Sequence, residues 1–152
     1  MTPPPGERLL RYVGDTVRFT LRDAQTAPSP TSGWQAKLRT NLGRAALLRE
    51  EVIRAHFEKV PFAGASWRDI PMRWENGGWS LTLPLTEVGF FKAKAYLIDP
   101  QGYQVWPDGP DFGVSIHPDA YRTANTIYCA FPRLFGAGKA AAATRIPNSK
   151  RR

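Results

Sequence analysis

Tryptophans are the side chains of this sequence that are best suited to bind a ligand. The chain has five, and Trp67, Trp74 and Trp106 lie in or beside segments with loop composition. A sugar binds by stacking its apolar face on an exposed aromatic ring while neighbouring polar groups bond its hydroxyls. These three are therefore the candidate carbohydrate-binding residues, although large aromatics are usually mostly buried, and packing under the helix or sheet edge is the alternative. Trp34 and Trp79 are expected in the core.

Two other groups of residues resemble catalytic machinery but have simpler explanations. Cys129 and His117 would supply a thiol nucleophile and its base, yet no oxyanion-hole loop or third orienting group accompanies them. Asp99, Asp108 and Asp111 suggest the paired carboxylates of glycoside hydrolysis. Their contexts, DPQG and PDGPD, are turn sequences in which aspartate bonds its own backbone. We expect no catalytic residue in this chain.

Neither a metal nor a cofactor is predicted. His56 and His117 are the only histidines and stand far apart, so a zinc site would also need several carboxylates. No glycine-rich phosphate loop of either common type occurs in the sequence.

The positive charge of the chain is concentrated near its C-terminal end. The formal net charge is +8, from 21 basic and 13 acidic residues. Without the five basic residues after position 136, 16 basic residues remain, so the rest of the chain carries only about +3. No basic helix, RNP-like motif or zinc-finger spacing is present, so nucleic acid is not an expected partner. The five tail residues are Lys139, Arg145, Lys150, Arg151 and Arg152.

Cysteine usage and hydropathy favour a cytoplasmic protein. Cys129 is the only cysteine, which excludes an intrachain disulfide. The N-terminal sequence MTPPPGERLL lacks the basic start and apolar core of a secretory signal, and no run approaches the ~20 apolar residues of a membrane helix. We expect neither export nor a membrane anchor.

Alternation of apolar and polar residues predicts strands along most of the chain. DTVRFTLRD, WQAKLRTNLG, GGWSLTLPL and GFFKAKAYL each follow the period of two that is typical of a strand with one buried face. Asn76-Gly77 is a strong hairpin signal, and the sequence from Asp99 to Gly102 predicts a second turn. With 152 residues, the chain has the length of one domain.

One segment has helical periodicity instead. Between residues 43 and 59, apolar residues recur at spacings of three and four, with Asn41 as a candidate cap and Pro61 as a stop. We expect an amphipathic helix whose apolar face carries Ala45, Leu48, Val52 and Ala55. Some six or seven strands with one inserted helix indicate an all-β fold, an antiparallel β-sandwich of immunoglobulin-like type.

The order of the later strands resembles a known family. From GGWSLTLPLTEVGFFKAKAYLIDPQG through WPDGPDFGVSIHP, a tryptophan-led strand, a Pro-Leu turn, a Gly-Phe-Phe strand and a final strand follow one another. In this order the chain resembles the immunoglobulin-like domain found ahead of the catalytic barrel in α-amylase-family enzymes, over roughly residues 14–118. The resemblance implies a non-catalytic N-terminal accessory domain that braces the barrel and contributes aromatic residues to α-glucan binding.

The next segment, YRTANTIYCAFPRLFG, is similar to the connector toward the barrel in amylase-like glycosidases and glucanotransferases. The resemblance implies that Tyr128, Phe131, Leu134 and Phe135 contact that barrel. It also implies that the family's catalytic carboxylates, which lie in the barrel, have no counterpart here. After residue 136 the sequence departs from the family, as expected of a truncated member. The expected segments are an N-terminal extension (1–13), the sandwich (14–118), the connector (119–136) and a basic low-complexity tail (137–152).

Two other functions remain open from the sequence. An autonomous carbohydrate-binding module would use the same three tryptophans. An interaction domain for another protein or for an acidic polymer would use the basic tail.

Overall fold

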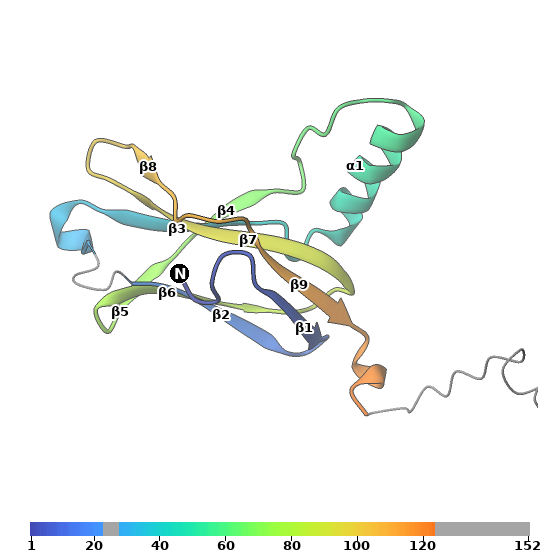
Figure 1. Cartoon of the computed structure of the whole chain (residues 1–152), viewed down its shortest axis with the longest axis horizontal. Helices are drawn as coiled ribbons and strands as arrows, with labels where there is room; N and C mark the ends of the chain where they lie inside the picture. Colours follow the sequence, from blue (N-terminus) through green and yellow to red (C-terminus); the bar gives the residue numbers. More distant parts are fainter. Residues whose placement is uncertain (23–27, 124–152) are drawn as a thin grey trace, which may run out of the picture. The chain divides into compact units, whose positions relative to one another are not determined.

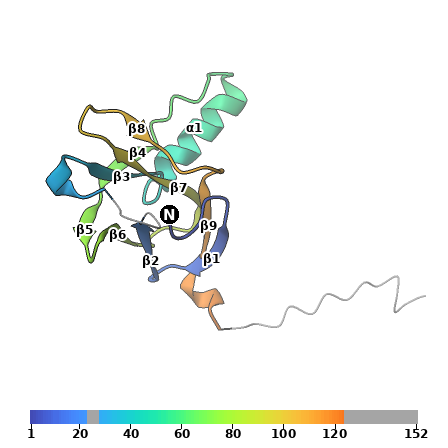
Figure 2. The same cartoon turned by 60° about the vertical axis from the view of Figure 1, so that its left-hand side comes forward.

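The computed structural model describes residues 1–22 and 28–123, and it shows two β-sheets that face each other with one helix at their edge (Figures 1 and 2). This is the all-β sandwich with a single helix that the sequence predicts. The elements in chain order are β1 (Arg8–Tyr12), β2 (Thr16–Leu21), the 3-10 turn η1 (Pro30–Ser32), β3 (Gln35–Thr40), α1 (Ala45–Phe57), β4 (Arg68–Pro71), β5 (Arg73–Glu75), β6 (Gly78–Pro84), β7 (Gly89–Ile98), β8 (Gln104–Val105), β9 (Phe112–His117) and the 3-10 turn η2 (Asp119–Tyr121).

The larger sheet has the order β1-β9-β7-β3-β4, with β8 paired to one end of β7, and the smaller sheet has the order β2-β6-β5. Neighbouring strands are antiparallel except for β1 and β9, which are parallel. The long strand β7 therefore occupies the middle of the larger sheet.

Residues 1–13, which the sequence sets apart as an N-terminal extension, are part of the sandwich in the structure. β1 pairs with β9 over its whole length, and Thr2 exchanges two backbone hydrogen bonds of 2.8 Å with Thr20 of β2. The segment RLLRY has no strict alternation because β1 is an edge strand whose residues are only partly buried. The alternation of apolar and polar residues that predicts the inner strands is therefore absent from β1.

The core fills the space between the two sheets and is built by the alternating residues of the central strands. Phe19 and Phe112, both fully buried, meet edge to face with ring centroids 5.6 Å apart. On β7, Phe91, Ala93 and Ala95 face inward as predicted. Trp79 lies in the core, where its indole N–H donates to the carbonyl of Pro28 (3.0 Å), and Trp34 packs against the core half-buried.

Both predicted turns are confirmed. Asn76 and Gly77 have positive φ angles of 51° and 74° and join β5 to β6, as a two-residue hairpin of type I′ requires. The Asp99 carboxylate accepts hydrogen bonds from the backbone N–H groups of Gln101 and Tyr103, at 2.9 and 2.8 Å. This aspartate therefore shapes its own turn.

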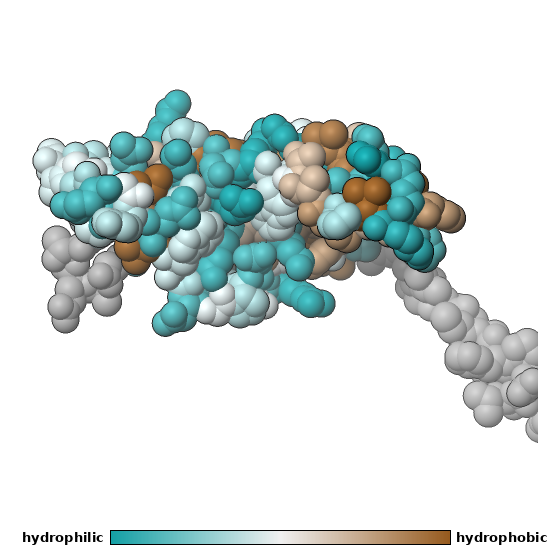
Figure 3. Space-filling view, turned by 90° about the horizontal axis from the view of Figure 1, so that it is seen from above, coloured by the Kyte–Doolittle hydropathy of each residue, from teal (hydrophilic) through white to brown (hydrophobic). Residues whose placement is uncertain are grey.

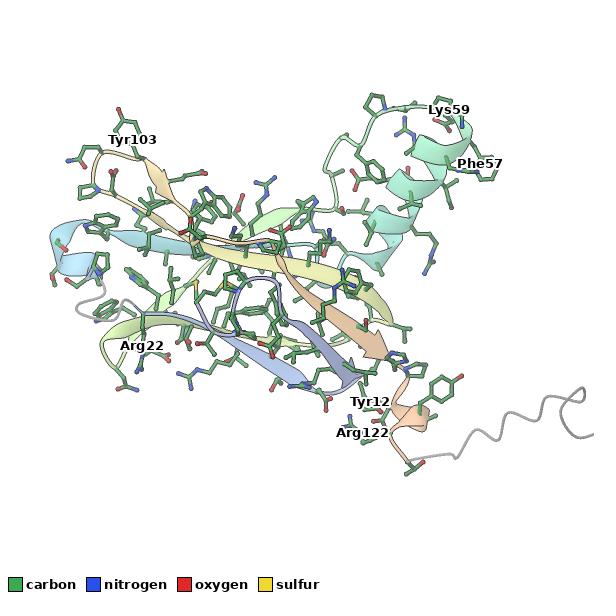
Figure 4. The ribbon with its side chains drawn as sticks, viewed as in Figure 1. Tyr12, Arg22, Phe57, Lys59, Tyr103 and Arg122 are labelled. Atoms are coloured by element: carbon green, nitrogen blue, oxygen red, sulfur yellow. The ribbon has the colours of Figure 1, made fainter. Side chains whose placement is uncertain are left out.

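Helix α1 is where the structure differs most from the expectation. Asn41 is not its cap, because the Asn41 side chain accepts a 2.8 Å hydrogen bond from the backbone N–H of Lys92 in β7. The cap is supplied by Glu87, whose carboxylate accepts from the N–H of Ala45 (2.8 Å). The helix projects from the sandwich, so none of its residues is buried, and half of Val52 is exposed. Phe57, the most exposed large apolar residue of the helix, points away from the sheets (Figure 4).

A carboxylate fastens α1 to the loop that follows it. Glu51 accepts hydrogen bonds from the Ser66 hydroxyl (2.6 Å) and from the backbone N–H groups of Ala65 (2.7 Å) and Ser66 (3.2 Å). These bonds, that of the Ser66 hydroxyl first, lower the pKa of Glu51. Ala45 and Leu48 pack against the core only partly buried, so this contact is a second attachment of the helix.

The end of η2 is fastened in a similar way. The Arg122 guanidinium lies over the Tyr12 ring and forms ion pairs with Asp15 and Asp119, both at 2.8 Å (Figure 4). A backbone hydrogen bond from Tyr12 and the side-chain bond from Arg122 lower the pKa of Asp15.

Removing the central aromatic pair should be costly. We expect Phe19→Ala to lower the free energy of unfolding by about 3–5 kcal/mol, because it leaves a cavity beside Phe112. Arg18→Ala, one residue away on the outer face, should cost below about 1 kcal/mol, since its ion pair with Glu75 is solvent-exposed. Urea unfolding of both variants checks this, and equal losses would contradict the assigned facing of β2.

The contact made by Glu51 should depend on pH. Its lowered pKa means that the contact stabilises the protein above the ordinary glutamate pKa of about 4.3 and weakens as pH falls through the lower folded-state value. Hydrogen exchange should therefore show the amide protection of Ala65 and Ser66 dropping in acid. Glu51→Gln should lose this protection already at neutral pH, whereas Glu50→Gln on the exposed side should keep it. Equal protection in both variants would show that the contact contributes nothing.

Candidate functional site

The outer face of the larger sheet carries a row of charged residues across three strands. Arg39 on β3 lies directly opposite Asp69 on β4 on one side and Lys94 on β7 on the other. The Arg39 guanidinium and the Asp69 carboxylate are 3.6 Å apart, and the Lys94 ammonium donates to the carbonyl of Gly109. Two cations thus stand side by side, and each is held by a separate acceptor.

Two tryptophans flank this row and complete a groove with a volume of about 310 Å3. Trp67 comes just before β4 and lies under the Arg39 guanidinium, 5.8 Å from the ring centroid. Trp106 comes just after β8. The groove, called here the tryptophan groove, is lined by Arg39, Trp67, Lys94, Trp106 and Asp111.

The Trp106 ring is positioned by a second aromatic residue. It stacks on Tyr96 of β7, with centroids 4.2 Å apart and planes 20° from parallel, and its indole N–H donates to the Gln104 side chain (3.2 Å). Trp106 is 37% exposed, whereas the Tyr96 beneath it is buried. Burial raises the pKa of Tyr96, and the nearby Asp69 carboxylate adds to the shift. The tyrosine therefore stays a neutral ring under the tryptophan.

The structure brings together two of the three predicted tryptophans. Trp67 and Trp106 line the same groove, whereas Trp74 lies on β5 of the smaller sheet. There it is half-buried and meets Trp79 edge to face at 5.3 Å. Arg39 and Lys94, which line the groove, and Tyr96, which supports Trp106, were not predicted from the sequence, although their outward positions in KLR and KAKAY were a signal for them.

The remaining candidates lie apart from the groove, with one exception. Asp111 lines it, Asp108 is exposed in the preceding loop, and Asp99 shapes its turn. His56 packs against the Phe57 ring at 4.9 Å on α1. Tyr128, Phe131, Leu134 and Phe135 of the connector, and Cys129, lie outside the described residues.

The groove combines groups that can contact a ligand in different ways. It offers two aromatic planes, cationic donors and the Asp111 carboxylate as an acceptor. Within residues 1–22 and 28–123, no three histidine, cysteine, aspartate or glutamate side chains are grouped so that they could hold a metal ion.

In the same residues, no helix is long and apolar enough to cross a membrane.

Comparison of the chain with protein-family models and with curated proteins finds no match. The tryptophan groove therefore has to be interpreted from its own residues.

The stack of Trp106 on Tyr96 can be tested directly. We expect Tyr96→Phe to keep the ring pair, and Tyr96→Leu to release Trp106 and lower the free energy of unfolding by about 0.5–1.5 kcal/mol beyond the loss of buried area. Fluorine NMR of 5-fluorotryptophan-labelled protein, with the Trp106 signal assigned by Trp106→Phe, should show that signal moving only in the leucine variant. An unmoved signal in that variant would mean that the loop positions Trp106 without Tyr96.

Proposed function

We propose that the chain is a non-catalytic N-terminal accessory domain of an α-amylase-family, α-glucan-active enzyme, and that its tryptophan groove holds part of the glucan. The observation that carries the proposal is that Trp67 and Trp106 flank one groove, although 38 positions separate them in the sequence. The strand order that resembles the family's immunoglobulin-like domain supports the enzyme class.

The groove offers what a short glucan segment needs. Sugar rings stack on aromatic faces, and the half-exposed Trp106, backed by Tyr96, presents a fixed face of this kind. Arg39 and Lys94 can donate to sugar hydroxyls, and Asp111 can accept from them. A volume of about 310 Å3 accommodates a small part of a chain, so the groove would extend a substrate path rather than enclose a substrate.

Exposed apolar side chains at the α1 end favour a protein partner, which in this proposal is the catalytic barrel. Phe57 is 76% and Phe62 is 62% exposed, and Ile53 lies half exposed one turn before Phe57. Figure 3 shows brown, apolar surface at this end of the molecule.

An autonomous carbohydrate-binding module, the alternative, would use the same groove without a barrel. Capture of a cognate barrel by the chain, and its loss in Phe57→Ser, would separate the two.

Glucan binding is tested by titration with maltohexaose. We expect a saturable change in tryptophan fluorescence, and we expect Trp106→Ala and Trp67→Ala each to weaken binding roughly tenfold or more, as the loss of an anchoring aromatic does. The matched control is Tyr103→Ala, because Tyr103 is 72% exposed at the β7–β8 turn and points into solvent (Figure 4). Flat titrations at millimolar sugar, with calorimetry also silent, would refute the proposal.

A further inference from the structure

A second hollow lies beside the tryptophan groove on the same face of the larger sheet. Its volume is about 320 Å3, and its lining includes Arg8, Phe90, Lys92, Asp111 and Gly113. Asp111 lines both hollows, so the two adjoin at this residue. A ligand lying along the tryptophan groove can therefore reach the second hollow.

Strand pairing places two cations in this hollow. Gly113 of β9 lies opposite Arg8 of β1 on one side and opposite Lys92 of β7 on the other. The missing side chain at Gly113 makes room for the Phe90 ring: a Cβ atom there would lie 2.8 Å from this ring and 3.5 Å from the Arg8 side chain. The Arg8 guanidinium lies 5.7 Å from the centroid of the Phe90 ring, within the range of a cation–π contact.

These two cations differ from the others on this face. Arg39 has Asp69 as its partner, whereas no carboxylate of the described residues lies within 4.0 Å of the Arg8 guanidinium or the Lys92 ammonium. Two cations without a close carboxylate partner, on either side of Gly113, favour an anionic ligand, because each can give it a charge-assisted hydrogen bond. A phosphate monoester, compact and with several acceptor oxygens, matches such a pair.

We infer that this hollow binds the phosphate of a phosphorylated α-glucan whose neutral sugar rings occupy the tryptophan groove. The inference rests on the proposed function, because it adds a substituent to the same ligand. A sparsely charged glucan fits better than a nucleic acid. Asp69 lies along the same face, so a polymer with a phosphate at every residue would bring a phosphate against this carboxylate.

The test compares two sugars by calorimetry at low salt: maltohexaose, and maltohexaose carrying a single 6-phosphate. We expect the phosphorylated sugar to bind about tenfold more tightly or better, as charge-assisted hydrogen bonds would give. Lys92→Gln and Arg8→Gln should each reduce this preference severalfold and leave maltohexaose binding unchanged. Lys37→Gln is the matched control, because Lys37 is a cation on the same face that lines neither hollow.

The outcomes separate this inference from the proposed function. Equal affinities for the two sugars, with maltohexaose still bound, would overturn the inference and keep the proposed function. Absence of binding by both sugars would overturn both. Tighter binding of single-stranded DNA than of the phosphorylated sugar, lost in Lys92→Gln, would replace the inference with a nucleic-acid surface. Binding of inorganic phosphate alone with the same affinity would show an anion site that is independent of glucan.

Discussion

The pleat of β7 is the constraint on which both the core and the candidate site depend. This strand pairs with β3 along one edge and with β9 along the other, and its side chains alternate strictly between the two faces. Phe91, Ala93 and Ala95 fill the core, whereas Lys92 and Lys94 line the hollows of the outer face. A slip of one residue would exchange the two sets, so burying the apolar set also fixes where the cations stand.

Side chains at the end of β3 and in the loop after it hold β7 in this register. The Thr40 hydroxyl donates to the carbonyl of Lys92, and the N–H of Lys92 donates to the Asn41 side chain, both at 2.8 Å. The loop thus carries the β3–β7 pairing beyond the end of β3. Asn41 is therefore not available to cap α1. The N–H of Ala45 in the first turn of the helix donates instead to Glu87, from the loop before β7.

The sequence was sufficient for the features that depend on local pattern. Alternation identified β2, β3 and β7, and Asn76-Gly77 identified the β5–β6 hairpin, because pleat and turn geometry act on adjacent residues. The parallel edge strand β1 escaped prediction because its partner β9 lies about a hundred positions away and its own residues are only partly buried. The periodicity of α1 predicted that Ala45, Leu48 and Ala55 share its more buried face, but not that none of them is fully buried, because spacing does not show how closely a helix approaches the sheets.

The site was predictable only in part for a related reason. Loop composition selected Trp67, Trp74 and Trp106 equally, and only the assignment of strands to sheets separates them. Trp74 follows the crossover from β4 to β5, which takes the chain to the other sheet, where Trp79 covers it. Trp67 precedes that crossover, and Trp106 follows a short strand paired with β7.

The charges of the outer face then decide what kind of ligand the paired tryptophans suit. Arg39 and Lys94 are directly opposite one another, an arrangement that destabilises a sheet unless other groups offset it. Asp69 offsets it for Arg39, and the Gly109 carbonyl does so for Lys94. Both cations are thereby held in place and keep further N–H donors for a ligand. Binding a ligand then costs these side chains little conformational entropy. Farther along the face, Arg8 and Lys92 have no such carboxylate among the described residues. The face thus carries paired cations beside the tryptophans and cations without a close carboxylate partner around Gly113, an arrangement that suits a neutral polymer with an occasional anionic group.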